Sequence, residues 1–333
     1  MSPKTGVIVQ PFQTIGVFGA GAWGLALGIA AAKAGRRVVV VGRGQGAMEA
    51  LKATRMSAKL PNARLPDEIA VGASPMALAA CDAILIVTPA QALRASLTVL
   101  APHTPGRPLV ICAKGIEQGT HLFLSEIVGA LAPKARLACL SGPSFAHDVA
   151  AGLPTAVTLA AGESALAAGL CQALHGPSLR LYASTDVRGV EIGGAAKNVL
   201  AIACGVADGL SLGASAKAAL VARGFAELSR FGEAYGARAE TLMGLSGLGD
   251  LVLTCTSPQS RNFSYGVALG RGTHDADGPL VEGAHTAQAL GALAAARGVD
   301  MPIVNAVVDV LDGRLGPAEA VRALLARRPR AEA

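Results

Sequence analysis

The sequence has few aromatic and few charged residues. Of its 333 residues, 3% are aromatic and 16% are charged, whereas 52% are hydrophobic. A nucleic-acid-binding surface usually combines dense Lys/Arg clusters with stacking aromatic rings, so we expect no nucleic-acid partner. The formal net charge of +6 favours anionic ligands in general. The length and the hydrophobic content indicate a globular protein of about two domains.

Patterned cysteines and histidines are also lacking. The six cysteines show no C-x-x-C spacing, and the six histidines form no H-x-x-x-H pair. Such patterns are typical of metal sites, redox motifs or disulfide frameworks. We therefore expect reduced, mostly buried thiols in a cytoplasmic protein, and no metal site.

Long uncharged runs are nearly absent. Only residues 15–32 approach the roughly 18 residues that a membrane-spanning helix needs. Glycines divide this run into a strand-forming piece at residues 15–18 and a helix-forming piece at residues 25–34. In a signal peptide the positive charge lies directly before the apolar region, whereas here residues 10–14 separate Lys4 from it. We expect neither an integral membrane span nor a targeting signal.

The same run contains the pattern G-x-G-x-x-G, at Gly19, Gly21 and Gly24, between the expected strand and helix. In a dinucleotide-binding turn the first glycine permits the tight turn, and the second lets the backbone approach a pyrophosphate. The third lets helix and strand pack closely. Free N–H groups at the helix N-terminus favour the anion. Because residues 37–41 supply the next buried parallel strand, the sequence predicts a dinucleotide-binding unit.

Arg43 follows that second strand, where an NAD-specific site usually offers Asp or Glu to the ribose hydroxyls. An arginine there can meet the 2′-phosphate of NADP, so we expect NADP or NAD as the cofactor, with NADP favoured. An arginine in a solvated loop, or one stacked on adenine, fits the sequence as well. The cofactor preference therefore stays open.

Three further apolar runs, at residues 83–87, 109–112 and 136–140, are each followed by turn-forming residues. They predict a doubly wound, Rossmann-like parallel sheet with both faces covered. Ligands of such sheets bind at the carboxyl ends of the strands. Residues 88–91, Lys114 and residues 141–146 are therefore candidates by position.

From about residue 190 the pattern becomes helical. Helices are predicted at residues 191–207, 214–232 and 282–297, with glycine-rich loops between them. We expect an α/β protein with a Rossmann-like dinucleotide-binding domain at residues 1–190. An all-helical substrate and catalytic domain would follow at residues 191–333.

The helical region contains polar residues suited to chemistry. Lys197 and Asn198 interrupt an apolar helix, Asp250 ends a glycine-rich loop, and Ser-Arg-Asn follows at residues 260–262. A lysine held by its neighbours can exchange a proton with a carbonyl oxygen, and a carboxylate can orient it. Arg261 and nearby backbone N–H groups can hold a phosphate. The alternatives are a surface lysine, a helix-capping aspartate and a solvated arginine.

Seven motifs together resemble bacterial NAD(P)-dependent glycerol-3-phosphate dehydrogenases. They occur in the order of that family and span nearly the whole chain, which makes them far more specific than the glycine pattern alone. The motifs are G-A-G-A-W-G at 19–24, A-K-G-I-E at 113–117, S-G-P-S-F-A at 141–146, G-G-A-A-K-N at 193–198, G-L-G-D-L at 247–251, S-R-N at 260–262 and V-E-G at 281–283.

The resemblance implies an enzyme that interconverts sn-glycerol 3-phosphate and dihydroxyacetone phosphate and thereby supplies glycerophospholipid synthesis. The implied catalytic set is Lys197 as general acid or base, with Lys114, Asn198, Asp250 and Thr254 around the reacting centre. The cofactor set, which includes the glycine turn, is Gly19, Gly21, Ala22, Trp23, Gly24, Arg43, Lys114, Ala146, Arg261, Val281 and Glu282. The implied substrate set is Lys114, Gly142, Ser144, Lys197, Asp250, Ser260, Arg261 and Asn262.

Lys197 needs a depressed pKa to act as a base in the oxidation direction. A neighbouring ammonium is the simplest source of such a depression, and Asp250 acts in the opposite direction. The expected partners are a small phosphorylated substrate and a second copy of the chain in a homodimer.

Two positions depart from the family pattern. Relatives often show Val-Pro-Ser-Gln where this chain has V-T-P-A-Q at residues 87–91, and Ala113 replaces a frequent threonine. We expect altered cofactor affinity and retained activity. Two alternatives remain: a β-hydroxyacid or 6-phosphogluconate-type dehydrogenase, and a non-catalytic dinucleotide-sensing module. The first does not explain S-R-N after G-L-G-D, and the second has no need of Lys197, Asp250 and Arg261 together.

Overall fold

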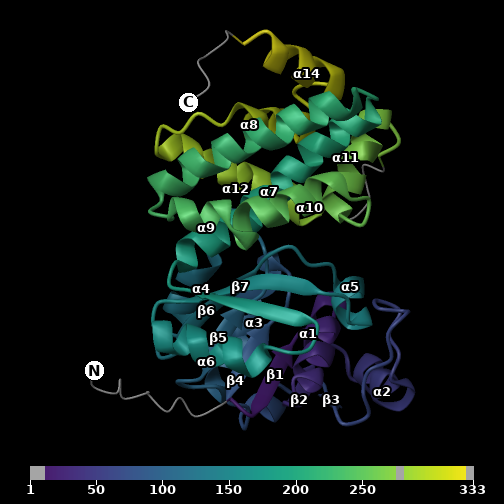
Figure 1. Ribbon diagram of the computed structural model, residues 1–333, viewed down its shortest axis with the longest axis vertical. Helices are drawn as coiled ribbons and strands as arrows, with labels where there is room; N and C mark the ends of the chain where they lie inside the picture. Colours follow the sequence, from purple (N-terminus) through teal and green to yellow (C-terminus); the bar gives the residue numbers. More distant parts are fainter. Residues whose placement is uncertain (1–11, 275–280, 328–333) are drawn as a thin grey trace, which may run out of the picture.

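The computed structural model describes residues 12–274 and 281–327. Figure 1 shows two stacked parts, a sheet flanked by helices and, above it, a group of helices from the later part of the chain. The strands are β1 (Thr14–Phe18), β2 (Arg37–Val41), β3 (Ala70–Gly72), β4 (Ala83–Ile86), β5 (Pro108–Ile111), β6 (Arg136–Ser141), β7 (Thr155–Ala161) and β8 (Leu179–Ser184). The helices around them are α1 (Ala22–Lys33), α2 (Gln45–Thr54), α3 (Leu93–Leu100), α4 (Leu124–Leu131), α5 (Ala146–Ala151) and α6 (Ser164–Leu174).

The strands form one sheet in the order β3-β2-β1-β4-β5-β6-β7-β8. All neighbouring pairs are parallel except β6 and β7. The side chains of the central strands β4 and β5 are all buried because helices cover both faces of the sheet. The predicted fold class, a Rossmann-like sheet followed by a helical region, is confirmed.

The sheet differs from the prediction at its far edge. An entirely parallel sheet was expected, but β7 runs antiparallel to β6, with Ser141 opposite Thr158. The connection between the two strands holds only the six-residue helix α5, which packs beside α1 at the end of the sheet. The chain therefore returns along β6 without the helical crossover that a parallel pair requires. Strands β3, β7 and β8 were not predicted.

The run at residues 15–32 forms strand β1, a turn and helix α1, as predicted. Helix α1 begins at Ala22, three residues earlier than expected, because the last glycine of the pattern lies inside the helix. Its residues from Gly24 to Ala31 are buried against the sheet. The apolar character of this run is thus explained by packing in the core.

The helical part contains α7 (Val187–Gly209), α8 (Gly213–Ala234), α9 (Ala239–Met243), α10 (Asp250–Thr256), α11 (Arg261–Arg271), α12 (Glu282–Ala296), α13 (Pro302–Leu311) and α14 (Pro317–Leu325). Three of these, α7, α8 and α12, were predicted within a few residues of their observed ends. Strand β8 ends at Ser184, so residue 190, where the domain boundary was expected, lies in the first turn of α7.

Helix α7 is the centre of the helical part, with α8, α10, α11 and α12 packed around it. Within the described ranges it is the one helix long and apolar enough to cross a membrane, and 94% of its most apolar window is buried inside the protein. Every residue from Gly189 to Ile202 is buried. Its length and hydropathy are therefore those of a core helix.

Helices α7 and α11 approach each other more closely than side chains would allow. A Cβ atom on Gly205 of α7 would lie 2.1 Å from the carbonyl oxygen of Phe263, and one on Gly266 of α11 would lie 2.2 Å from that of Ile202. Both distances are well inside van der Waals contact. The two backbones therefore pack directly on each other, and this contact fixes the position of α11.

Candidate functional site

The glycine turn after β1 has the shape that a pyrophosphate needs. Gly19 has a φ of +128°, and a Cβ atom there would lie 2.6 Å from the Val87 carbonyl oxygen. A Cβ atom on Gly24 would lie 1.9 Å from the Gly19 oxygen, whereas one on Gly21 meets nothing within 4 Å. Gly21 is the N-cap of α1 and offers no side chain to the first-turn N–H groups. The turn thus leaves open space in front of free donors, and it fits a dinucleotide.

Two other predicted cofactor residues lie beside this turn. The backbone N–H of Gly19 donates to the carbonyl oxygen of Val41 at 2.8 Å. The exposed Arg43, two residues after Val41, therefore lies at the carboxyl ends of the strands, as the glycine turn does. Trp23 is the second residue of α1, and its buried indole N–H has no hydrogen-bond partner among the described residues. An orphaned donor at this position also fits a ligand with acceptor oxygens.

The predicted catalytic residues converge on one buried carboxylate. Asp250, which is fully buried, accepts a hydrogen bond from Lys114 Nζ at 2.7 Å and another from Lys197 Nζ. Lys197 also donates to Thr254 Oγ1 at 2.9 Å. Lys114 donates to the carbonyl oxygen of Gly142 at 2.9 Å. Two ammonium groups therefore share one aspartate.

Three separate elements bring these groups together. Lys114 follows β5 at the carboxyl end of the sheet, Lys197 lies in the middle of α7, and Asp250 is the first residue of α10. The glycine-rich segment before Asp250, expected as a loop, forms a π-helical turn at Leu245–Gly249. Such turns are rare and occur frequently at functional sites. The turn leads directly into the residue that holds both lysines.

Burial is the main reason why Lys197 has a depressed pKa. Its side chain is 7% exposed, and loss of hydration lowers the pKa from 10.5 to about 7. Asp250 raises the pKa, and the neighbouring ammonium of Lys114 lowers it again. The sequence prediction named the second ammonium as the source, but desolvation is the larger cause. Lys197 can therefore gain or lose a proton near neutral pH.

A chain of side-chain amides connects the helical part to the sheet. The N–H of Gly283 donates to Asn262 Oδ1, Asn262 Nδ2 donates to Asn198 Oδ1, and Asn198 Nδ2 donates to the carbonyl oxygen of Lys114, each at 2.9 Å. These bonds run from α12 through α11 and α7 to the segment after β5. They fix Asn262 relative to both lysines.

The remaining predicted residues lie at the start of α11, in the turn after β6 and at the start of α5. Ser260 is the N-cap of α11, and its hydroxyl accepts from the Phe263 N–H at 3.2 Å. Arg261, the first residue of α11, is exposed. Ser144 donates to the Gly142 carbonyl oxygen at 3.0 Å, and Ala146 begins α5.

Val281 and Glu282 lie at the start of α12. Glu282 accepts from the N–H of Ala90 at 3.3 Å, so it joins the helical part to the segment after β4. Burial raises its pKa, although the hydrogen bond from the Ala90 N–H and the charge of Arg261 act in the opposite direction.

The sequence interpretation missed one buried hydroxyl beside Glu282. Thr286 is fully buried, and neither its Oγ1 atom nor Oε2 of Glu282 has a partner among the described residues. A Cβ atom on Gly115 would lie 3.1 Å from the first and 3.2 Å from the second. The spacing of four residues, which puts both side chains on one face of α12, was the signal that could have identified Thr286.

The dinucleotide turn and the buried lysine–carboxylate cluster both lie at the carboxyl ends of the strands. Together they are the features of a dinucleotide-dependent dehydrogenase. Residues 14–167 match the model of the NAD-dependent glycerol-3-phosphate dehydrogenase N-terminus, and residues 186–322 match that of the C-terminus. The chain belongs to the NAD-dependent glycerol-3-phosphate dehydrogenase family. The predicted resemblance is confirmed.

Individual relatives support this assignment along the whole chain. A glycerol-3-phosphate dehydrogenase (NAD(P)+) of Bradyrhizobium sp. (strain BTAi1 / ATCC BAA-1182) is 58% identical over 322 residues, which cover 96% of this chain and 99% of the relative. One of Azorhizobium caulinodans is 57% identical, with 98% and 100% covered. The crystal structure of glycerol-3-phosphate dehydrogenase from Coxiella burnetii has a TM-score of 0.89 at 38% identity, covering 95% of this chain and 99% of that one.

The alternatives from the sequence find less support. A structure of D-mandelate dehydrogenase has a TM-score of 0.62 at 15% identity, which shows a shared fold alone. The family match extends over both parts of the chain and includes the segments that carry Lys197, Asp250 and Arg261. The assignment therefore favours the predicted dehydrogenase over a hydroxyacid dehydrogenase or a sensing module.

Proposed function

We propose that this protein is a glycerol-3-phosphate dehydrogenase that interconverts sn-glycerol 3-phosphate and dihydroxyacetone phosphate with NAD or NADP. The observation that carries the proposal is the pair of lysines on Asp250, one of them with a pKa of about 7, beside the amide chain. The product of the reduction would supply glycerophospholipid synthesis. Six free thiols, five of them buried, support a reducing compartment such as the cytoplasm.

Lys197 is the proposed general acid and base. For reduction, its ammonium donates a proton to the ketone oxygen at carbon 2, and for oxidation the neutral amine takes the proton back. When bound, the nicotinamide of the cofactor would supply or accept the hydride. Lys114 stabilises the negative charge that develops on the oxygen, because its ammonium is held in place by Asp250 and the Gly142 carbonyl before the substrate arrives.

The substrate phosphate is assigned to the start of α11. Arg261 is exposed there, and the first N–H groups of the helix have only the Ser260 side chain as a cap. An arginine with free helix N–H groups favours a phosphate. Asn262 and Asn198 hold this end at a fixed place relative to Lys114. Gly142 and Ser144 complete the substrate contacts.

The cofactor is assigned to the glycine turn, with Arg43 at the ribose and with Ala146, Val281 and Glu282 toward the helical part. NADP is favoured because the exposed Arg43 stands where a carboxylate would select NAD. In this proposal residues 1–190 bind the cofactor and residues 191–333 bind the substrate and carry out proton transfer. The active form is a homodimer, which light scattering of the purified protein tests directly.

The activity is tested by the absorbance of the reduced nicotinamide. Purified protein is mixed with dihydroxyacetone phosphate and either NADH or NADPH, and the loss of absorbance is followed. Rapid oxidation of a cofactor is expected, with the larger kcat/KM for NADPH. Folded protein that oxidises neither cofactor would refute the assignment. Oxidation with a β-ketoacid in place of dihydroxyacetone phosphate would favour the hydroxyacid alternative.

A further inference from the structure

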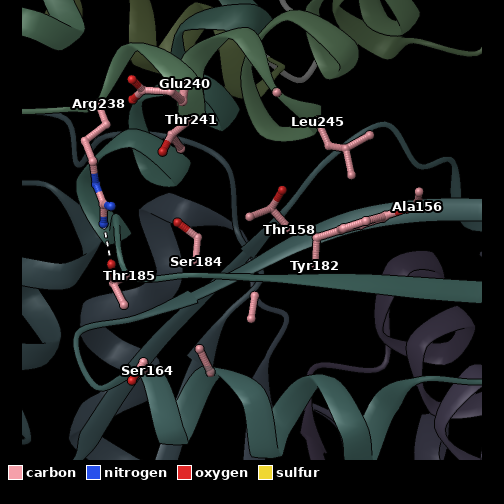
Figure 2. Close-up of a pocket in the computed structure, with 13 residues that line it drawn as sticks. Ala156, Thr158, Ser164, Tyr182, Ser184, Thr185, Arg238, Glu240, Thr241 and Leu245 are labelled. Carbon is pink, nitrogen blue, oxygen red and sulfur yellow. Dashed lines mark hydrogen bonds between the residues drawn. The ribbon is translucent and has the colours of Figure 1, made fainter.

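A cavity of about 730 Å³ lies between strands β7 and β8 and helix α9. Figure 2 shows the residues that line it, among them Arg238, whose guanidinium donates to the hydroxyl of Thr185. None of the polar side chains that line it is among the buried atoms that lack a hydrogen-bond partner in the described ranges. The cavity therefore has no buried polar group that requires a ligand.

Buried polar atoms without a partner lie instead at the carboxyl ends of the strands. Trp23 follows β1, Thr88 follows β4, and Ser141 is the last residue of β6. Glu282 and Thr286 lie on α12, beside the segments that follow β4 and β5. Because buried polar groups in proteins are nearly always hydrogen-bonded, these atoms indicate where contacts are still to be completed.

The strand order gives the direction of the cofactor along this edge. Strands β1, β4 and β5 are neighbours in that order. The glycine turn follows β1, Ala90 follows β4, and Lys114 follows β5. In the proposed function the pyrophosphate lies at the glycine turn and the hydride is exchanged near the lysines. The part of the dinucleotide that passes the end of β4 is therefore the nicotinamide half, which consists of a ribose and the nicotinamide ring.

The carboxylate of Glu282 lies at this place. One oxygen accepts from the Ala90 N–H at 3.3 Å, and the other, Oε2, lies 3.2 Å from the point that a Cβ atom on Gly115 would occupy. The carboxylate thus connects the ends of β4 and β5. An ionised carboxylate only accepts hydrogen bonds, and the nicotinamide half offers donors in its ribose hydroxyls and its carboxamide N–H groups.

Glu282 needs donors of its own to stay ionised. Burial raises its pKa, and the opposing influences are the Ala90 N–H and the charge of Arg261. The bond from Ala90 is long for an N–H donor. A further hydrogen bond to Oε2 would favour the charged form of the carboxylate and fix its orientation.

Thr286 has a donor available for Oε2. It is fully buried and lies four residues after Glu282, on the same face of α12. Its Oγ1 atom lies 3.1 Å from the same Cβ position on Gly115. A threonine inside a helix commonly donates to the carbonyl oxygen four residues earlier, but this Oγ1 has no partner among the described residues. Its proton is therefore free for the carboxylate.

We propose that Thr286 is a positioning residue for the cofactor: its hydroxyl donates to Oε2 of Glu282 and holds this carboxylate toward the nicotinamide half of the dinucleotide. The inference rests on the proposed function, in which Glu282 binds the cofactor. Gly115 is part of the arrangement, because a Cβ atom there would press on both oxygens and would lie 2.8 Å from the Cβ atom of Ala90.

The test is the Kd of two ligands, measured by calorimetry of the full chain without substrate. NADPH contains the nicotinamide half, and adenosine 2′,5′-bisphosphate lacks it. Thr286→Val keeps the shape of the side chain and removes the hydroxyl, so it should weaken NADPH binding by about tenfold and leave the Kd of the bisphosphate within about twofold. Thr286→Ser keeps the hydroxyl and should bind NADPH about as tightly as the wild type.

A double-mutant cycle tests whether Thr286 acts through Glu282. Glu282→Leu removes the acceptor, so Thr286→Val should weaken NADPH binding little further in that background. The same loss in both backgrounds would overturn the proposal. An unchanged NADPH Kd in Thr286→Val, an equal loss in Thr286→Ser, or an equal loss for the bisphosphate would overturn it as well.

The proposed dehydrogenase activity is judged by a separate measurement, the oxidation of NADPH by dihydroxyacetone phosphate in the wild type. Wild-type protein that binds NADPH but does not oxidise it would refute the proposed activity and leave the binding test of Thr286 decisive. Active enzyme in which Thr286→Val binds NADPH normally would refute the role of Thr286 alone. Folded wild-type protein that binds no NADPH would overturn both.

Discussion

Replacement of Lys114 by methionine should raise the pKa of Lys197 and displace the pH profile of the reaction. Both ammonium groups bind the same carboxylate, one on each oxygen. In general, two unit positive charges separated by about 4–6 Å, at an effective dielectric constant of about 20, repel by about 3–4 kcal/mol, which corresponds to about two to three pH units. Solvent near the partly exposed Lys114 reduces this effect. We therefore expect a displacement of one to two pH units upward, from about 7.

The sign of the effect differs between the two directions. Oxidation of glycerol 3-phosphate needs the neutral amine, so its kcat/KM should rise with pH, with a midpoint at about pH 7 in the wild type. In Lys114→Met the midpoint of this rise should lie about one pH unit or more higher. Reduction needs the ammonium, so its rate should fall over the same range. The measurement is kcat/KM against pH in both directions.

The midpoint of the profile separates this effect from a simple loss of activity. Lys114→Met will also lower the maximal rate, because it removes a group that stabilises the developing charge, but the midpoint does not depend on the amplitude. Lys114→Arg keeps the positive charge and should keep the midpoint near that of the wild type. A profile of Lys114→Met that is lower but has an unchanged midpoint would refute the electrostatic account of Lys197.

Five further substitutions test other parts of the structure. Lys197→Met should lower kcat by about 10²-fold or more, with an unchanged Kd for reduced cofactor measured by its fluorescence, because it removes the general acid. Arg43→Ser should raise the KM for NADPH about tenfold and leave that for NADH within about twofold, since each charge-assisted bond contributes about 1.5–3 kcal/mol. Gly21→Ala should weaken cofactor binding without changing the Tm of the free protein, because its Cβ meets no protein atom, whereas Gly24→Ala should lower the Tm as well. Asn262→Leu should lower the free energy of unfolding by about 2–4 kcal/mol in a urea titration, because it leaves two buried polar groups unpaired.

Much of the sheet could be predicted because its central strands are short, continuous apolar runs bounded by turns. Strand β7 was not predicted because its sequence, TAVTLAA, is rich in alanine, which has little preference for strands. Strand β8 carried a usable signal, since Leu179 and Leu181 are buried while Arg180 and Tyr182 are exposed, the alternation of an edge strand. The direction of β7 was not predictable, because it depends on where α5 packs.

For the candidate site, the sequence motifs named candidate residues but not their arrangement. Lys114, Lys197 and Asp250 are far apart in the chain, and only the packing of α7 against the sheet and α10 brings them to one point. The dominant cause of the depressed pKa of Lys197 is burial, which depends on every element around α7.

The direct contact between the backbones of α7 and α11 has a consequence for substrate choice. In the proposed function, α7 carries the residue that acts at carbon 2, and α11 carries the one that holds the phosphate. Because Gly205 and Gly266 already meet, α11 cannot move inward, and any side chain at either position would push it outward. In the proposed function, the crossing would therefore hold the residue that acts at carbon 2 and the residue that binds the phosphate at a fixed separation, from a position outside the site.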